Sequence, residues 1–125
     1  MKYLVDTSLL IELLRGNEKV AELLENLPKP VYISGVTEAE LLSGKECKQP
    51  DKERKIIELI SLFQKINPSN EINKIAGKLR RERDMSLLDA LIAATAIKIG
   101  ATLITLDKDF ERVREVKVEI FRRTR

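Results

Sequence analysis

The sequence contains no histidine among its 125 residues. Histidine is the side chain that most often acts as a general acid or base near neutral pH, so its absence excludes serine–histidine hydrolases, RNA cleavage by paired histidines and histidine-ligated zinc sites. Aromatic residues make up only 4% of the chain, too few and too scattered for a platform that stacks nucleic-acid bases. Any catalysis must therefore depend on carboxylates, lysines, hydroxyl groups or a bound metal.

Cysteine is almost absent as well. The single Cys47 cannot form an intrachain disulfide or a cysteine-based zinc site, so we expect a reducing, cytoplasmic location. Long hydrophobic runs are also lacking: Asp6 follows before an apolar signal segment can develop, and the apolar stretch at 90–97 is far shorter than a membrane span. The sequence therefore predicts a protein without a membrane partner.

The chain has the length and composition of one modest domain. Its 125 residues are 43% hydrophobic, which is enough for a single core, so we expect one domain over residues 1–125. The 23 basic and 20 acidic residues leave a net charge of only +3. This balance does not indicate a protein that coats nucleic acid, and a polyanionic partner would have to bind a local basic patch.

Short apolar runs alternate with helical periodicities along the chain. The pattern predicts strands at residues 3–5, 31–33, 65–66, 101–106 and 116–121. It predicts helices that begin near residues 9, 20, 37, 51, 72 and 87. Helices between successive strands imply parallel pairing, and fully apolar strands imply a sheet that is covered on both faces. We therefore expect an α/β fold, a three-layer α/β/α sandwich around a parallel sheet of about five strands.

The acidic residues of interest each have a structural explanation. Asp6 suits the N-cap of the first helix. The spacings 37–40 and 86–89 both fit a capping box, in which the acid returns to the amide of a hydroxyl-bearing N-cap. Asp107 and Asp109 are common turn residues. Taken one at a time, these acids do not require a function.

The positions of four acids suggest a shared site. Asp6 and Asp107 come just after the carboxyl ends of predicted parallel strands, where open α/β sheets have their ligand crevice. The helices that carry Glu40 and Asp89 leave the same edge. Four carboxylates gathered there would raise one another's pKa unless a cation offset their charge, and Mg²⁺ or Mn²⁺ prefers such oxygen ligands. The sequence therefore predicts a metal site that could hydrolyse a phosphodiester without histidine.

Two of the four positions have competitors. Glu38 and Glu40 point about 200° apart on a helix, so only one of them can face the crevice. Asp109 competes with Asp107, which we prefer because it follows the strand more directly. A further acid, Asp84, fits a solvated helix end.

Several other polar residues could support such a site. The hydroxyls could bond the carboxylates or a scissile phosphate, or could act only as caps and buried strand hydroxyls. They are Thr7, Ser8 and Thr105. The basic residues Lys78, Arg80, Arg81 and Arg83 form either a solvated helix face or a phosphate-binding cluster.

Four segments resemble the signatures of VapC-type PIN domains, in order and over essentially the whole chain. Residues 5–16 resemble the family's opening turn and leucine-rich helix, and residues 33–41 resemble its second signature, whose last acid is Glu40. Residues 89–96 match the third signature, with Asp89 as the central acid. Residues 105–110 match the fourth, where many relatives have asparagine before aspartate and this chain has Asp107 and Asp109. The fourth metal ligand therefore stays open between these two residues.

The resemblance implies a five-stranded parallel α/β/α fold and a metal-dependent endoribonuclease that leaves a 5′-phosphate. It implies Mg²⁺ or Mn²⁺ ligands at Asp6, Glu40, Asp89 and Asp107, with Thr7, Thr105 and Asp109 in support. It also implies a homodimer and a VapB-like antitoxin that covers the site. The alternatives are a housekeeping PIN nuclease in RNA processing and a non-catalytic α/β binding or regulatory module. The RNA that is cut, the cleavage site and the number of metal ions do not follow from the sequence.

Overall fold

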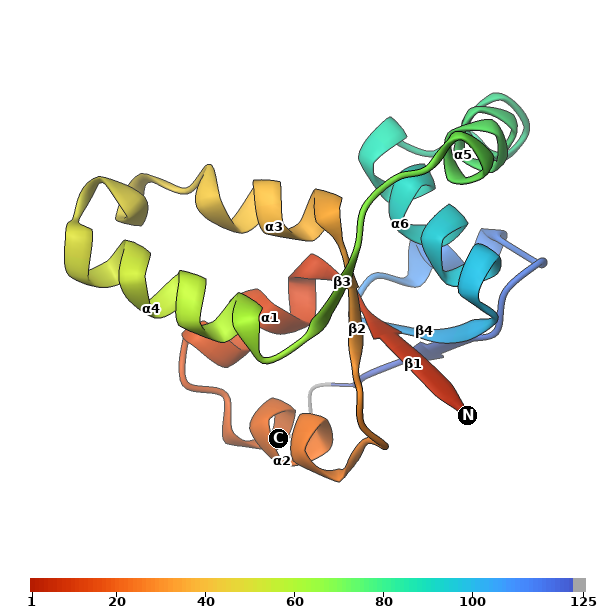
Figure 1. Cartoon of the computed structure of the whole chain (residues 1–125). Coiled ribbons are helices and arrows are strands. Elements are labelled where there is room, and N and C mark those ends of the chain that lie inside the picture. The colour runs from red at the N-terminus through yellow and green to blue at the C-terminus, as the bar shows by residue number, and fades with distance from the viewer. Residues whose placement is uncertain (123–125) are drawn as a thin grey trace.

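The computed structural model describes residues 1–122, which form five strands, six α-helices and two 3-10 helices (Figure 1). The strands are β1 (Lys2–Val5), β2 (Tyr32–Ser34), β3 (Gln64–Ile66), β4 (Ala101–Thr105) and β5 (Val118–Ile120). The α-helices are α1 (Thr7–Leu14), α2 (Glu18–Asn26), α3 (Gly35–Leu42), α4 (Pro50–Ser61), α5 (Asn70–Arg83) and α6 (Leu87–Ile99). The 3-10 helices are η1 (Lys45–Lys48) and η2 (Lys108–Arg112).

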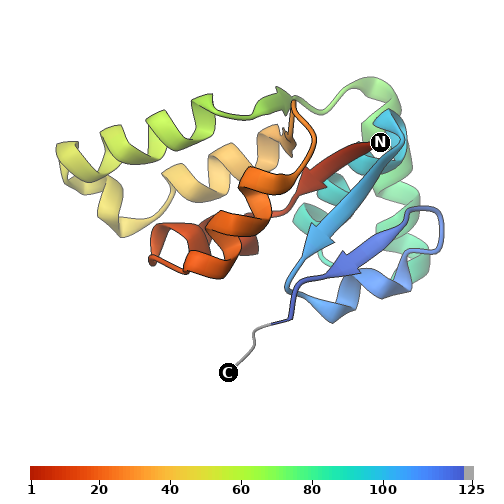
Figure 2. The same cartoon turned by 90° about the horizontal axis from the view of Figure 1, so that it is seen from below.

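The sheet is parallel throughout and has the strand order β3-β2-β1-β4-β5. Strand β1 lies at the centre, where Leu4 is in register with Tyr32 of β2 and Leu103 of β4. Figure 2 shows β4 and β5 side by side with their arrowheads at the same end. The carboxyl ends of all five strands therefore meet at one edge, as the sequence predicted.

Alternate residues of the central strands enter two separate cores. Leu4 and Leu103 belong to a core that contains residues of α5 and α6, whereas Val5 and Ile104 belong to one that contains residues of α1, α2 and α4. Figure 1 accordingly shows α5 and α6 together on one side of the molecule, away from α1, α2 and α4. All five residues of β4 are buried, because helices cover both faces of the sheet. The predicted three-layer α/β/α sandwich is confirmed.

The start of α3 differs from the sequence prediction. The helix begins at Gly35, because the hydroxyl of Ser34 at the end of β2 accepts the backbone N–H of Val36 and serves as N-cap. Thr37 therefore lies inside the helix, and its predicted role as the cap of a capping box is wrong. An added Cβ at Gly35 would meet the side-chain oxygen of Asn67, so a larger residue there would have to displace that side chain.

The other helix ends follow more familiar rules. The hydroxyl of Ser86 accepts the N–H of Asp89 at the start of α6, and Gly100 ends that helix with a left-handed φ of 69°. The ammonium of Lys29 donates to three carbonyls at the end of α2, those of Leu24, Glu25 and Leu27. No helix within residues 1–122 has the length and apolar character needed to cross a membrane.

Candidate active site

Asp6 is the most buried acid at the carboxyl edge of the sheet, with 4% of its surface exposed. It directly follows β1, and its backbone N–H donates to the carbonyl of Ile104 on β4 at 3.1 Å. As N-cap of α1, its carboxylate accepts the backbone N–H of Ser8 at 3.1 Å. Burial raises the pKa of Asp6 above its ordinary value, and the hydrogen bonds from Ser8 and Thr105 offset only part of that rise. The fold therefore holds in a fixed position a carboxylate whose charged form is disfavoured by burial.

Two hydroxyl groups join this carboxylate to the end of β4. Thr105 donates to Oδ2 of Asp6 at 2.6 Å and accepts the backbone N–H of Asp107 at 3.0 Å. Ser8 donates to Oδ1 of Asp6 at 2.5 Å and accepts the backbone N–H of Leu106 at 3.2 Å. Strand β4 ends at Thr105, one residue earlier than predicted, because the next two amides bond these hydroxyls. Each oxygen of Asp6 is thus fixed to the segment that carries Asp107.

Glu40 is held by the residue that follows Asp6. The hydroxyl of Thr7 donates to Oε1 of Glu40 at 2.5 Å and lies 3.0 Å from the fully buried hydroxyl of Thr37. These contacts fasten α3 to the start of α1. Glu38 points elsewhere, since both of its oxygens accept hydrogen bonds from the ammonium of Lys65 on β3, at 2.9 and 3.1 Å. The two glutamates are therefore separated as their helical spacing requires, and Glu40 is the one on the Asp6 side.

Asp89 lies in the first turn of α6, and the charges of other acids affect its pKa. Partial burial raises the pKa of Asp89, a hydrogen bond with Ser86 lowers it, and the negative charges of Asp107, Glu40 and Asp109 raise it further. These residues come from α3, from α6 and from the segment after β4. Acids that are far apart in sequence thus lie close enough to repel one another.

Asp107 caps η2. Its Oδ1 accepts the backbone N–H of Asp109 at 2.8 Å, so the turn predicted at 107–110 is the start of a 3-10 helix. Asp109 lies farther out, with one oxygen 3.7 Å from a guanidinium nitrogen of Arg112. Asp107 is the acid whose amide is tied to the Thr105–Asp6 pair, which favours it over Asp109 as the fourth site residue.

The acids influence one another without converging on one point. Within residues 1–122, no three acidic or cysteine side chains lie close enough to form a ready metal-binding group. The chemistry of the donors nevertheless fits Mg²⁺ or Mn²⁺, because carboxylate oxygens surrounded by hydroxyl groups are hard ligands. Burial, and then the charges of Asp107, Glu40 and Asp109, raise the pKa of Asp89, and a divalent cation bound beside it would offset that negative charge.

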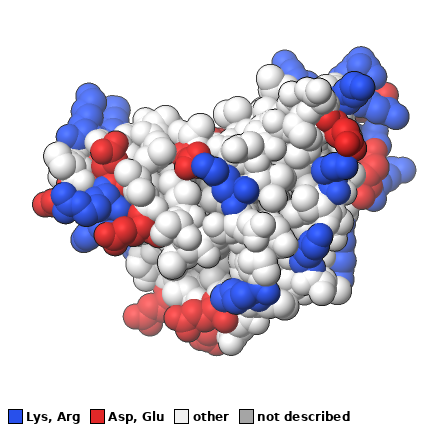
Figure 3. Space-filling model, viewed as in Figure 1, with Lys and Arg blue, Asp and Glu red and all other residues white. Residues whose placement is uncertain are grey.

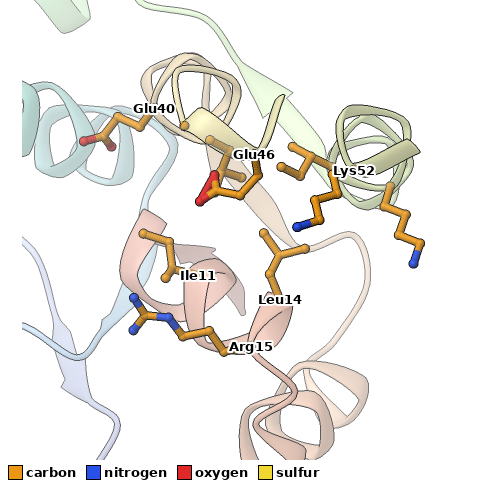
Figure 4. A pocket seen from close by; sticks show the side chains of 10 residues that line it. Ile11, Leu14, Arg15, Glu40, Glu46 and Lys52 are labelled. Atoms are coloured by element: carbon orange, nitrogen blue, oxygen red, sulfur yellow. The ribbon is translucent and has the colours of Figure 1, made fainter. Parts of the chain in front are cut away.

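Two hollows flank α1 next to these acids. One, of about 470 Å³, is lined by Ser8 and Asp107 among others. The second is a groove of about 480 Å³ that Glu40 lines at one end. In Figure 4, Ile11, Leu14 and Arg15 of α1 lie on one side of this groove and Glu46 and Lys52 on the other. Glu40 and Asp107 are therefore each reached from an open hollow beside α1.

The remaining predicted candidates lie outside the acidic group. Asp84 ends α5 with a left-handed φ of 53° and is exposed, in line with a helix-end role. Along α5, Arg80 donates to the carbonyl of Met85, and Arg83 pairs with Glu115 at 2.8 Å. The contact of Thr37 with Thr7 was not foreseen, because a cap was the stronger local interpretation of Thr37.

The fold has close counterparts among solved structures. A toxin–antitoxin complex from Klebsiella pneumoniae matches with 34% identity and a TM-score of 0.82, over 92% of this chain and 95% of the other. VapBC2 of Rickettsia felis, solved with a DNA fragment from its promoter, matches with 27% identity and a TM-score of 0.85, over 98% and 100% of the two chains. VapBC-1 of nontypeable Haemophilus influenzae matches with 26% identity and a TM-score of 0.82, over 96% and 98%.

Comparison of the sequence with known families and proteins gives one clear result. No curated protein sequence matches the chain. The family model of the PIN domain, a nuclease domain, matches residues 3–116, a range that contains the buried Asp6, the Glu40 of α3, the Asp89 of α6 and the Asp107 that caps η2. Together with the parallel sheet and the acids at its carboxyl edge, this match means that the chain belongs to the PIN domain family.

Proposed function

We propose that this chain is a metal-dependent endoribonuclease and the toxin half of a type II toxin–antitoxin pair. The observation that carries the proposal is the set of four acids, Asp6, Glu40, Asp89 and Asp107, that distant segments bring to one edge of the sheet. Hydrogen bonds fix Asp6 and Glu40, and charge couples Asp89 to Glu40 and Asp107. Structural caps alone would not need to gather at one edge of the sheet, with hydroxyl groups of neighbouring segments bonded to Asp6 and Glu40.

The four acids would hold Mg²⁺ or Mn²⁺, with Asp109 as a supporting residue. A divalent cation bound there would offset the carboxylate charge, make water a better nucleophile and stabilise the departing oxygen of the phosphodiester. The chain's own part is to position its ligands. Thr105 and Ser8 hold both oxygens of Asp6, and Thr7 holds Glu40, so these hydroxyls orient carboxylates rather than a phosphate. Without histidine, none of these steps uses an imidazole.

A partner protein belongs to the same proposal. The matched chains of Klebsiella pneumoniae, Rickettsia felis and Haemophilus influenzae were solved as toxin–antitoxin or VapBC assemblies. By this similarity, a VapB-like antitoxin binds this chain and controls its access to RNA, and the chain acts as a single PIN domain that forms a homodimer in the cytoplasm. A small reading frame beside its gene would encode that antitoxin.

Cleavage of a structured RNA labelled at one end tests the proposal. The purified chain should cut inside the RNA in Mg²⁺ or Mn²⁺, leave 5′-phosphate ends and stop cutting in EDTA. Asp6→Asn should abolish cleavage while circular dichroism shows an intact fold. Asp51→Asn is the matched control, because Asp51 is an exposed acid on α4 whose one ion pair within residues 1–122 is with Arg54. Equal cleavage by the wild type and Asp6→Asn would reject the proposal and favour a non-catalytic module.

A further inference from the structure

Three arginines lie around an open hollow beside the acidic site. The hollow, of about 540 Å³, is lined by Glu82, Arg83, Asp84, Arg112 and Arg114. It lies where the end of α5 meets η2 and the residues that follow it. We call Arg83, Arg112 and Arg114 the arginine rim.

Arg112 connects the rim to the acidic site. One nitrogen of its guanidinium donates to the carbonyl of Asp84 at 3.0 Å, and another lies 3.7 Å from Asp109. The backbone N–H of Asp109 in turn donates to Oδ1 of Asp107 at 2.8 Å. The guanidinium of Arg112 therefore lies between the end of α5 and the turn that carries Asp107 and Asp109.

Much of the positive charge on the rim is available to a ligand. Arg112 is half exposed, and Arg114 is exposed and has no ion pair in the part of the chain that the structure describes. Arg83 pairs with Glu115 at 2.8 Å, a closer ion pair than the 3.7 Å contact of Arg112 with Asp109. The segments 78–84 and 108–117 together carry eight basic and five acidic residues, so their net charge is positive.

The charge of the surface is unevenly distributed. Figure 3 shows Lys and Arg crowded over α5 at the upper right and acidic side chains over α2 at the bottom. The acids over α2 include Glu18, Glu22 and Glu25. On this face Lys and Arg also lie at the left of the view, mixed with acids, so α5 is one of two basic regions that would attract a polyanion, whereas the α2 side would repel it.

We propose that the arginine rim binds the sugar–phosphate backbone of RNA next to the bond that is cut. The inference rests on the proposed function, because it names the path of that substrate. Four carboxylates repel a phosphate chain, so cations close to them are needed to bring it in. Guanidinium groups suit this task, since they bind phosphate oxygens through paired N–H donors and stay charged at every relevant pH.

The double variant Arg112→Gln/Arg114→Gln tests the rim. Its matched control is Lys2→Gln/Lys98→Gln, which removes the same charge at the opposite edge of the sheet. Like the rim variant, it combines one cation that has an ion pair with one that has none among the described residues. Lys98 pairs with Glu71 at 2.7 Å, and Lys2 lies at the start of β1 without an ion pair among the described residues. Binding of a fluorescent single-stranded RNA is measured in EDTA at several salt concentrations, so that it does not depend on cleavage.

The rim variant should bind RNA about tenfold more weakly than the wild type, and the slope of log Kd against log salt should fall by about 1.4, for two lost phosphate contacts. The control variant should keep more of the wild-type affinity and more of the wild-type salt slope than the rim variant does. In cleavage assays, the rim variant should show a raised KM with little change in kcat. Arg112→Lys keeps the charge and should restore much of the affinity. Arg114 is exposed and makes no hydrogen bond or ion pair within residues 1–122, so Arg114→Gln should fold normally and lose only RNA binding.

The proposal is overturned if the rim and control variants have the same affinity and salt slope. It is also overturned if the rim variant binds RNA normally and has lost only its binding to an acidic antitoxin segment or to double-stranded DNA. These outcomes are distinct from failure of the proposed function. If the proposed function fails, the wild type does not cleave RNA in Mg²⁺. If the wild type cleaves RNA and the rim variant binds RNA as well as the wild type does, only the role of the rim is refuted.

Discussion

The hydroxyl of Thr105 donates to Asp6 at 2.6 Å across 99 positions of sequence. The same hydroxyl accepts the backbone N–H of Asp107, so one oxygen atom fixes two site residues that follow adjacent parallel strands. Because Thr105 is fully buried, no water can replace it without rearrangement. The geometry of the acidic edge therefore depends on a residue that is not itself an acid.

Thr105→Val should weaken both stability and cleavage. Valine has nearly the same shape but leaves a buried carboxylate oxygen and a buried N–H without their partner, which costs about 1–3 kcal/mol of unfolding free energy. Loss of a group that orients a metal ligand should lower cleavage by about 10–100-fold. Urea denaturation and RNA cleavage measure the two effects.

Thr95→Val is the control for that variant. Thr95 is also fully buried, but its hydroxyl donates only to the carbonyl of Leu91 in its own helix, which does not need that bond. It should lose less than about 1 kcal/mol and keep its activity. Equal effects of the two substitutions would show that the Thr105 bond has no special role.

The Glu40→Gln and Glu38→Gln variants separate the two neighbouring glutamates of α3. Mn²⁺ should raise the melting temperature of the wild type, because a ligand that binds only the folded chain stabilises it. Glu40→Gln should reduce this increase and abolish cleavage, since an amide is a weaker ligand for the metal than a carboxylate. Glu38→Gln should keep both, because Glu38 pairs with Lys65 instead. The opposite ranking would move the site to the other face of α3.

The stability of Asp6→Asn should depend differently on pH. Burial raises the pKa of Asp6 in the folded chain, so the folded chain binds this proton more readily than the unfolded chain. Ionisation of Asp6 therefore destabilises the wild type as pH rises above the unfolded pKa, about 3.9. The Asp6→Asn variant has no carboxyl group to ionise at this position and escapes this loss.

Melting temperatures of the two proteins between pH 3 and 7 check this expectation. The value for Asp6→Asn minus that of the wild type should grow as pH rises and then level off. A difference that stays constant or shrinks would contradict the destabilisation of a buried charge at this position.

Lys29→Met should destabilise the chain by about 0.5–1 kcal/mol, because a cation at the end of a helix is favoured by its dipole and its free carbonyls. The ammonium of Lys29 is 2.6 Å from the carbonyl of Leu24 and 3.1 Å from that of Leu27. Lys74→Met is the control, because Lys74 lies at an exposed position within α5, and its effect on stability should be smaller. Thermal denaturation in low salt compares the two, and equal losses would remove the special role of Lys29.

The sequence predicted the fold well because its signals were local and consistent. Helix α6 was predicted over its observed range, since Ser86 begins it and Gly100 ends it. The parallel sheet followed from helices placed between apolar strands. The start of α3 was wrong by two residues, because the hydroxyls of Ser34 and Thr37 both suit an N-cap and the structure uses that of Ser34.

The site was less predictable, because its defining contacts cross the sheet. That Asp6 and Asp107 follow neighbouring strands could be inferred, but the shared hydroxyl of Thr105 depends on the register of β1 and β4. Glu38 and Glu40 were equivalent by sequence spacing, and only the partners Lys65 and Thr7 distinguish them. The position of Arg112 beside Asp109 and Asp84 had no local signal at all.

A crystal structure of the chain grown with Mn²⁺, measured at the manganese absorption edge, tests the central claim most directly. The account predicts an anomalous peak at the carboxyl edge, within bonding distance of carboxylate oxygens from Asp6 and from at least one of Glu40, Asp89 and Asp107. A chain that cleaves RNA in Mn²⁺ but shows its only anomalous peaks away from these four acids would contradict it.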